Sequence, residues 1–220
     1  MNYGIKLLVR GDYALFTRPE LKVERVSYDV MTPSAARAIV EAIYWKPAIR
    51  WIIDSILVLN PVKFDNLRRN EVKSKIAEQS ISAAMKTNSA ICLYADDSDI
   101  RQQRAATLLR DVAYIIEAHF EYVPGMGDEN DGKHLEIFNR RLENGQCFAQ
   151  PYLGTREFSC SFEPVKEKYT SQLEGERDLG IMLFDLDFSD KKNPQPLFFR
   201  AKMSDGLMLV PHPDSEEVLR

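Results

Sequence analysis

The 220-residue sequence is short of the features that bind metals, form disulfide frameworks or cross membranes. Its three cysteines, Cys92, Cys147 and Cys160, are too few and too scattered for a disulfide framework or a zinc cluster. No apolar run approaches the ~20 residues that span a bilayer, and Met1–Lys6 lacks the layout of a signal peptide. We therefore expect a cytoplasmic protein in a reducing compartment, with no membrane contact.

Histidine and glycine are also scarce in the patterns that hold metals and cofactors. The three histidines, His119, His134 and His212, have spacings that fit no compact metal motif. The acidic run Asp96–Asp99 lacks the glycine and the distal glutamate of a calcium-binding loop. The Gly125–Gly127 turn follows a strand pattern but lacks the rest of a dinucleotide fingerprint. No metal site and no cofactor is predicted, so any catalysis is expected to be metal-free.

Charge is unevenly distributed along the chain. Residues 1–110 carry 17 Lys and Arg against 12 Asp and Glu, a net charge of +5. Residues 111–220 carry 12 against 21, a net charge of −9. A local basic surface on an otherwise acidic protein produces such a split and would suit an anionic partner. Chance produces it as well, because sequence halves need not be spatial halves, and both interpretations stay open.

The first part of the chain predicts a strand, a helix and a second strand. Tyr3–Arg10 alternates apolar and polar residues in the manner of a strand. Thr32 is a typical N-cap and Pro33 suits the first helical position, so a helix is expected to begin there. It ends before Pro47, because the residue before a proline is pushed out of the helical region. Arg50–Leu59 predicts the second strand.

Residues 62–106 have a more polar character. They hold a helix pattern over Leu67–Met85 and are too many for a tight hairpin. We therefore expect an insertion that projects from the sheet or covers one of its faces. The clearest strand pattern of the chain follows at Leu108–Val123, then a helix at Lys133–Glu143 and a strand at Thr155–Pro164.

The order strand, helix, strand, strand, helix, strand predicts an α+β fold. Residues 1–165 are expected to form a ferredoxin-like domain, a plan also used by RNA-recognition modules. Residues 166–220 predict a small antiparallel β domain. Its strands are expected at 181–188, 197–203 and 207–210. The Ser204-Asp205-Gly206 turn between the last two has the composition of a tight hairpin.

His119 is the residue best suited to acid–base chemistry. It shares the polar face of its predicted strand with Glu117 and Glu121. An imidazole titrates near neutral pH, and neighbouring carboxylates favour its protonated form. Metal-free cleavage of RNA needs the 2′-hydroxyl activated and the leaving 5′-oxygen protonated, and an imidazole can do either. A surface histidine without a chemical role is the commoner explanation of this pattern.

Tyr44 and two nearby cations are further candidates. Tyr44 lies late in the first predicted helix, followed by Lys46 and Arg50. A phenol is a poor base at neutral pH unless cations lower its pKa, which Lys46 or Arg50 could do. Either cation could instead bind the scissile phosphate. A tyrosine at the rim of the core with its hydroxyl in water is the commoner case.

Basic side chains of the polar insertion are candidate phosphate contacts. They are Arg68, Arg69, Lys73 and Lys75. Lysine and arginine neutralise backbone phosphates whatever the base sequence. A solvated helix face explains the same residues equally well.

Five blocks, in order along the chain, resemble one known family. The blocks are Gly11–Thr17, Ile43–Pro47, Leu109–Val112, Glu117–Phe120 and Tyr152–Phe158. They resemble the CRISPR-associated endoribonuclease of subtype I-C (Dvulg type). That protein is the RAMP-superfamily subunit that processes precursor CRISPR RNA and stays in the Cascade complex. The resemblance covers about residues 3–165, and the short β-rich tail fits it as well.

The resemblance implies metal-independent cleavage at the base of the repeat hairpin. The expected products are a 2′,3′-cyclic phosphate and a guide RNA with a 5′ handle. Tyr44 matches the family's active-site tyrosine and His119 its active-site histidine. The family also has a catalytic lysine beside that histidine, where this chain has Ala118. Lys46 is the cation we expect to stabilise the phosphate in its place.

Basic residues of the first half are expected to hold the repeat stem. They are Arg10, Arg50, Arg68, Arg69, Lys73, Lys75 and Arg110. The implied partners are CRISPR repeat RNA, the mature crRNA and other subtype I-C Cascade subunits, with double-stranded DNA as a further candidate. Ala118 favours a rival hypothesis, a non-catalytic subunit that clamps the 5′ handle. A second rival, a small-molecule enzyme on a ferredoxin-like scaffold, is disfavoured by the five blocks in order.

Overall fold

One large antiparallel sheet organises the molecule. A computed structural model describes residues 4–21, 23–127, 130–190 and 192–220. The strands are β1 Gly4–Ala14, β2 Arg25–Val26, β3 Ile49–Val58, β4 Phe64–Val72, β5 Arg101–Tyr122, β6 Ser161–Pro164, β7 Glu176–Asp187, β8 Gln195–Ser204 and β9 Leu207–Leu209. Their spatial order is β6-β1-β5-β3-β9-β8-β7, and β2 and β4 also pair with β5. Among these strands, the short β2 runs parallel to its neighbour.

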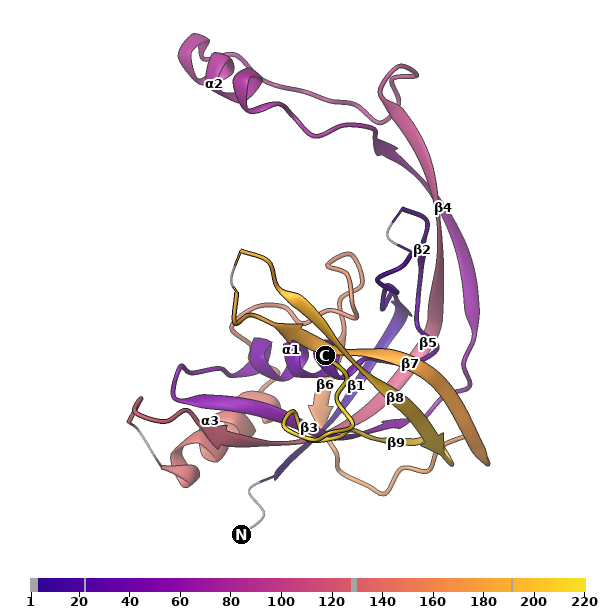
Figure 1. Cartoon of the computed structure of the whole chain (residues 1–220), viewed down its shortest axis with the longest axis vertical. Coiled ribbons are helices and arrows are strands. Elements are labelled where there is room, and N and C mark those ends of the chain that lie inside the picture. Colours follow the sequence, from indigo (N-terminus) through magenta and orange to yellow (C-terminus); the bar gives the residue numbers. More distant parts are fainter. Residues whose placement is uncertain (1–3, 22, 128–129, 191) are drawn as a thin grey trace.

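Strand β5 links the body of the protein to a projecting arm (Figure 1). Its second half lies between β1 and β3, whereas its first half pairs with β4 from Phe64↔Leu109 to Val72↔Arg101. The two halves meet at Asp111, which has a positive φ of 54°. Non-glycine residues rarely adopt this left-handed conformation, and aspartate is among those that tolerate it. The root of the arm is therefore a local kink in a 22-residue strand.

Helices α1 (Pro33–Ile43) and α3 (Asp131–Glu143) cover one face of the sheet. The Thr32 hydroxyl accepts a hydrogen bond from the Ala35 backbone N–H, which caps α1 as the sequence predicted. The apolar stripe of α1 is buried on β3, and strand β7 curls back over the helix (Figure 1). A bidentate pair between Arg37 and Asp185, at 2.7 and 3.0 Å, ties α1 to β7. The main core lies inside this curl.

The structure corrects the expected helix at Leu67–Met85. Its first part, Leu67–Val72, is strand β4, and helix α2 runs only over Glu78–Thr87 at the tip of the arm. The insertion does project from the sheet, which confirms one of the two expected arrangements (Figure 1). Both faces of the arm strands are largely exposed, so they lack the alternating apolar residues that reveal a strand. The sequence of this long polar segment therefore does not distinguish a strand from a helix.

The other expected elements are present with shifted bounds. The strand at Leu108–Val123 begins earlier, at Arg101, and the strand at Thr155–Pro164 is reduced to Ser161–Pro164. Tyr3, where the first strand was expected to begin, lies outside the described residues. The Asp205-Gly206 hairpin is confirmed, with both residues at positive φ. Strands β7, β8 and β9 join the main sheet because β9 pairs with β3.

Candidate active site on the open face of the sheet

Alternate residues of β5 point to opposite faces of the sheet. Ala118 and Phe120 belong to the main core, under the helices. His119 lies on the other face, which α1 and α3 leave uncovered and which we call the open face. Its side chain is 32% exposed. The structure therefore presents His119 to solvent on a rigid central strand, as a general acid or base requires.

Asp54 orients His119 from the neighbouring strand. Nδ1 of His119 lies 2.7 Å from Oδ1 of Asp54. Asp54 is the extra residue of a β-bulge in β3, because the register shifts between Ile53↔Ala118 and Ser55↔Glu117. Bulges commonly re-aim a side chain next to an active site. An ionised carboxylate only accepts hydrogen bonds, so Nδ1 carries the proton and Nε2 is left to exchange protons with a substrate.

A second histidine on the open face has a different hydrogen-bonding pattern. His212 reaches Glu121 through Nε2 at 3.0 Å, while its Nδ1 accepts the backbone N–H of Asp214 at 3.2 Å. Both ring nitrogens are thus engaged. The backbone N–H of Val210 donates to the carbonyl of Asp54 at 3.0 Å and brings this C-terminal segment beside the bulge. Of the two histidines, His119 is the one whose second nitrogen the described residues leave available.

Two cations share the open face with His119. Lys6 on β1 forms an ion pair with Glu117. Arg50 on β3 is exposed and pairs in register with Glu121, which places both side chains on one face. Either cation could bind a phosphate whose neighbouring ester bond lies near His119. Arg50 is among the RNA contacts predicted from the sequence, whereas Lys6 is not.

The structure places Tyr44 on the opposite side of the sheet from His119. Tyr44 follows α1, is 1% exposed and packs in the main core. Its hydroxyl lies 2.8 Å from Nδ1 of His134 on α3, and the guanidinium of Arg141 lies 5.4 Å from its ring centroid. The two side chains expected to act on one phosphate are thus not brought together. Exposed Lys46 follows Tyr44 in the segment after α1.

Ala118 is fully buried and faces the same core as Tyr44. A longer side chain at this position would point under the helices and not toward the open face. The absence at this position of the lysine that the resemblance implies therefore removes no cation from the surface that carries His119. Lys6 and Arg50 are the cations that the structure sets on that surface.

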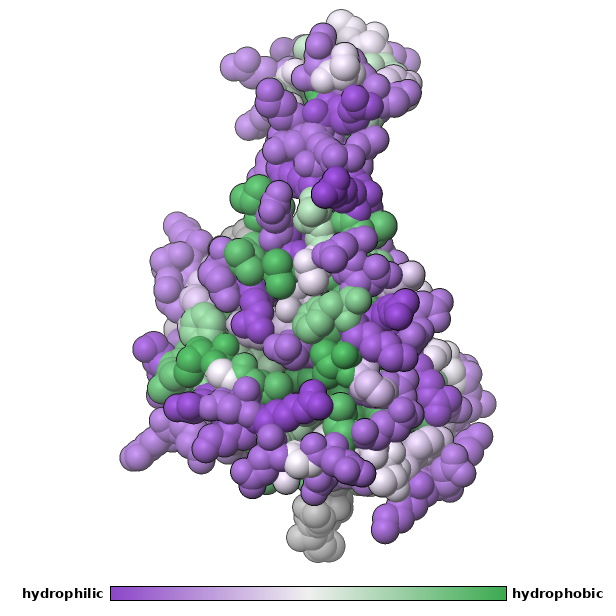
Figure 2. All heavy atoms as spheres, turned by 90° about the vertical axis from the view of Figure 1, so that its right-hand side faces the viewer, coloured by the Kyte–Doolittle hydropathy of each residue, from purple (hydrophilic) through white to green (hydrophobic). Residues whose placement is uncertain are grey.

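The arm carries most of the predicted phosphate contacts. Arg68, Lys73 and Lys75 are exposed on β4 and the segment after it. Arg69 is engaged with the body, since its guanidinium lies 2.7 Å from Glu157 and 5.9 Å from the ring centroid of Phe158. The arm is mostly hydrophilic, whereas hydrophobic patches gather on the body below it (Figure 2). Three of the four basic residues are thus available to an anionic partner.

Two further predicted contacts lie where the arm leaves the body. Arg10 on β1 reaches Glu163 at 3.5 Å, and its guanidinium lies 5.9 Å from the ring centroid of Tyr169. Arg110 on β5 is exposed and pairs in register with Tyr13. The basic candidates therefore fall into two groups, the arm with its root and the vicinity of His119.

Comparison with known protein families adds a decisive observation. The family model of the CRISPR-associated protein Cas5, in its Cas5d form, matches residues 4–211. The chain belongs to the Cas5d family. A "CRISPR pre-crRNA endoribonuclease Cas5d" of Mannheimia succiniciproducens is 53% identical over the full length of both chains. A protein of the same name from Thermus thermophilus is 40% identical, over 98% of this chain and 95% of the relative.

A solved structure supports the fold of this Cas5d-family chain. A crystal structure described as a CRISPR-associated protein superposes with a TM-score of 0.70. It covers 99% of this chain and 96% of its own, at 24% sequence identity. The similarity at this identity concerns the fold alone.

The buried Cys160 is poorly suited to nucleophilic chemistry in this Cas5d-family chain. Burial raises the pKa of the Cys160 thiol to about 12, with a backbone hydrogen bond opposing it, so the thiol stays protonated.

No cluster of three or more His, Cys, Asp or Glu side chains among the described residues is placed to hold a metal. No helix of the described residues is long and apolar enough to cross a membrane.

Sequence reasoning missed Asp54, Lys6 and His134. Asp54 is the charged residue that interrupts the apolar run at the centre of β3, and that interruption is a signal that could have marked it. Nothing in the sequence pairs it with His119, because the bulge that aligns them depends on strand register. His134 was weighed only as a metal ligand, yet it is the buried partner of Tyr44.

Proposed function

We propose that this chain cleaves precursor CRISPR RNA without a metal ion, with His119 as its general acid or base. The observation that carries the proposal is the Asp54–His119 pair on the open face, 2.7 Å apart. A carboxylate that fixes the tautomer and orientation of an imidazole leaves the other nitrogen ready for proton transfer. The two curated relatives, both named as pre-crRNA endoribonucleases, support the same reaction.

The proposed reaction is an internal attack within the RNA. The ribose 2′-oxygen forms a bond to the adjacent phosphorus as its proton leaves, and the bond to the 5′-oxygen breaks as that oxygen gains a proton. His119 Nε2 takes the first proton or gives the second. Lys6 and Arg50 would offset the extra negative charge on the phosphate. The products are a 2′,3′-cyclic phosphate and a 5′-hydroxyl.

Tyr44 and Lys46 stay candidates from the sequence and the resemblance. A direct role for the Tyr44 hydroxyl would need an arrangement different from the one seen here, because the sheet separates it from His119. The basic arm, with Arg68, Lys73 and Lys75, is proposed to hold the repeat stem through its phosphates. Other Cascade subunits and the crRNA are the proposed lasting partners, with double-stranded DNA a further candidate.

We also propose a ferredoxin-like plan for residues 1–165. The strand order β6-β1-β5-β3, with α1 and α3 on one face, supports it. The arm, formed by β4, α2 and the first half of β5, is then the insertion of that plan. The C-terminal strands extend the same sheet through the pairing of β9 with β3.

The alternative function is a non-catalytic subunit that only clamps the 5′ handle. The alanine at position 118, where the family has a lysine, favours it. Incubation of labelled repeat RNA with the protein in EDTA distinguishes the two functions. We expect one product ending in a 2′,3′-cyclic phosphate, and none when the nucleotide at the cut carries a 2′-deoxyribose. Binding with no cleavage of the all-ribose RNA would establish the clamp instead.

A further inference from the structure

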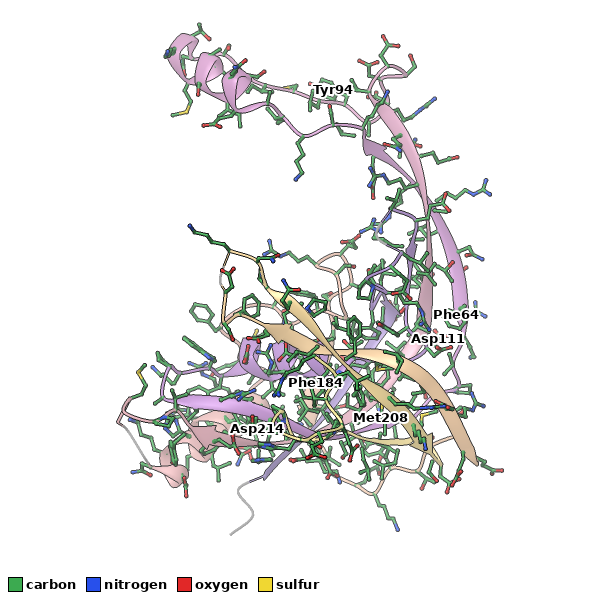
Figure 3. All side chains as sticks on the ribbon, viewed as in Figure 1. Phe64, Tyr94, Asp111, Phe184, Met208 and Asp214 are labelled. Atoms are coloured by element: carbon green, nitrogen blue, oxygen red, sulfur yellow. The ribbon has the colours of Figure 1, made fainter. Side chains whose placement is uncertain are left out.

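A pocket of about 470 Å³ lies at the root of the arm and has no part in the proposed chemistry. Its walls come from β1, the segment after β3, the kink of β5, the start of β6 and residues 169–172. Its volume falls in the range of small-ligand sites. Asp111, which lines it, lies at the foot of the arm, well apart from Asp214 beside His212 (Figure 3).

The pocket combines an apolar floor with one aromatic wall. Leu59, Val112 and Ala113 are buried beneath it. Tyr169 is half-buried, packs against the apolar cluster that includes Leu59 and Ala113, and has the Arg10 guanidinium 5.9 Å from its ring centroid. An apolar floor beside an aromatic ring suits the face of a nucleobase.

The rim is rich in hydrogen-bond acceptors. Asp12, Asp111 and Asn60 all line the pocket, and Nζ of Lys63 lies 3.7 Å from Oδ2 of Asp111. The Asn60 side-chain NH₂ donates to the backbone carbonyl of Asp111 at 2.7 Å, which fixes the amide and leaves its oxygen as an acceptor. Arg10 also lines the pocket, but its guanidinium is engaged with Glu163 and the Tyr169 ring. The carboxylates of Asp12 and Asp111 disfavour a phosphate inside, so a nucleotide would enter with its base inside and its phosphate toward Arg10.

We propose that this pocket binds one unpaired guanine of the RNA. Guanine presents two adjacent donors, N1–H and the N2 amino group, which match the two oxygens of one carboxylate. Adenine and cytosine offer an exocyclic amino group beside an acceptor, and uracil offers one N–H between two acceptors. Those acceptors would face Asp12 or Asp111 and be repelled. The proposal rests on the proposed function for its ligand, a single-stranded part of the repeat RNA.

The pocket and His119 share the open face, so a guanine bound in the pocket would position the rest of the RNA relative to His119. Along the β1–β5 pairing, Arg10 is opposite Ala113 and Gly4 is opposite His119. Six residues of strand separate the two positions, about 20 Å at ~3.3 Å per residue. Val165 and Tyr169 pack on the buried Leu8 and Ile115 between the two positions. A strand of RNA that crosses this segment would have a guanine fixed at the pocket and a phosphate a few nucleotides away at His119. The pocket sets which phosphate is cut.

Binding of a non-cleavable repeat RNA, with a 2′-deoxyribose at the cut, tests the proposal by gel shift in EDTA. Each guanine is replaced in turn by inosine, which lacks the N2 amino group. We expect one unpaired position at which the inosine replacement lowers the affinity of the RNA for the wild-type protein about tenfold. The same replacement should have no effect in one of the two variants Asp12→Asn and Asp111→Asn, the one that removes the carboxylate paired with the base, whereas Asp96→Asn on the arm should behave as wild type. The proposal is overturned if inosine at no unpaired position weakens binding to wild type. It is also overturned if inosine weakens binding to both Asp12→Asn and Asp111→Asn as much as it weakens binding to wild type.

Titration with 5′-GMP, 5′-AMP, 5′-CMP and 5′-UMP, followed by saturation-transfer NMR, separates this proposal from the cleavage reaction. We expect GMP to bind about tenfold more tightly than the others and to lose that advantage in the same aspartate variant that loses the inosine effect. GMP preference without repeat cleavage would refute the proposed function and keep the pocket. Cleavage with no preference among the four nucleotides would refute the pocket and keep the function.

Discussion

The carboxylate of Asp54 lies 2.7 Å from Nδ1 of His119, and a bulge in β3 makes this contact possible. Without the extra residue, a side chain at position 54 would alternate with its neighbours and could not be aimed in this way. The pair gives the open face an oriented imidazole, and it links the register of two central strands to the proposed chemistry.

Replacement of Asp54 by asparagine should slow cleavage of repeat RNA at least about tenfold. The amide cannot hold the Nδ1–H tautomer of His119 as a carboxylate does, so Nε2 is less often ready for proton transfer. Single-turnover rates measured from pH 5 to pH 9 test this. Glu121→Gln is the matched control, because Glu121 contacts His212 and not His119. Equal rates for Asp54→Asn and wild type would remove Asp54 from the mechanism.

Replacement of Tyr44 by phenylalanine should act mainly on stability. The change deletes the buried hydrogen bond to His134, which costs about 1 kcal/mol of unfolding free energy in urea titrations. Cleavage by the folded variant should fall far less than in His119→Ala. Tyr114→Phe, a second buried tyrosine of the same core, is the control. A loss of cleavage at unchanged stability would show that Tyr44 reaches the RNA in another arrangement.

Neutralising the exposed basic residues of the arm should weaken RNA binding in a salt-dependent way. With Arg68, Lys73 and Lys75 all changed to glutamine, the slope of log K against log salt should become shallower by about 3, at ~0.9 for each duplex phosphate that is no longer neutralised. Gel shifts at 50 to 300 mM salt measure this slope. Arg177, Lys192 and Lys202, exposed on β7, β8 and the turn between them, give a control with the same charge change. Equal slopes for the two triple variants would separate the arm from RNA binding.

The contact of the arm with the body should weaken in acid. Burial opposes ionisation of Glu157, but its own backbone amide, the hydrogen bond and charge of Arg69 and the charge of Arg25 outweigh it and lower the pKa of Glu157. A lowered folded pKa adds stability that is present above the ordinary value of 4.5 and is lost as the pH falls through the folded pKa.

Thermal unfolding of wild type and Glu157→Gln between pH 7 and pH 3 tests this contact. Wild type should be the more stable at pH 7, and the difference should disappear in the acid range below pH 4.5. A difference that stays constant down to pH 3 would mean that the ionised carboxylate does not stabilise the fold.

Local signals in the sequence predicted the capped helix α1, the hairpin at Asp205-Gly206 and the polar face that carries His119. Each depends on residues close together in the chain, such as the Thr32 cap. Pairings over long distances could not be predicted in the same way. Asp54 and His119 lie 65 residues apart in the sequence, and Tyr44 and His134 lie 90 apart. Strand register and helix packing bring each pair into contact. The polar strands of the arm gave no periodic signal, because neither face is buried.

The central claim is that His119 transfers a proton during RNA cleavage. It is tested most directly by single-turnover cleavage of labelled repeat RNA in EDTA with His119→Ala and, as a matched histidine change, His212→Asn. The account predicts a loss of at least about a hundredfold for His119→Ala and a change of no more than about threefold for His212→Asn. Cleavage by His119→Ala at the wild-type rate, with the variant folded and RNA binding intact, would contradict it.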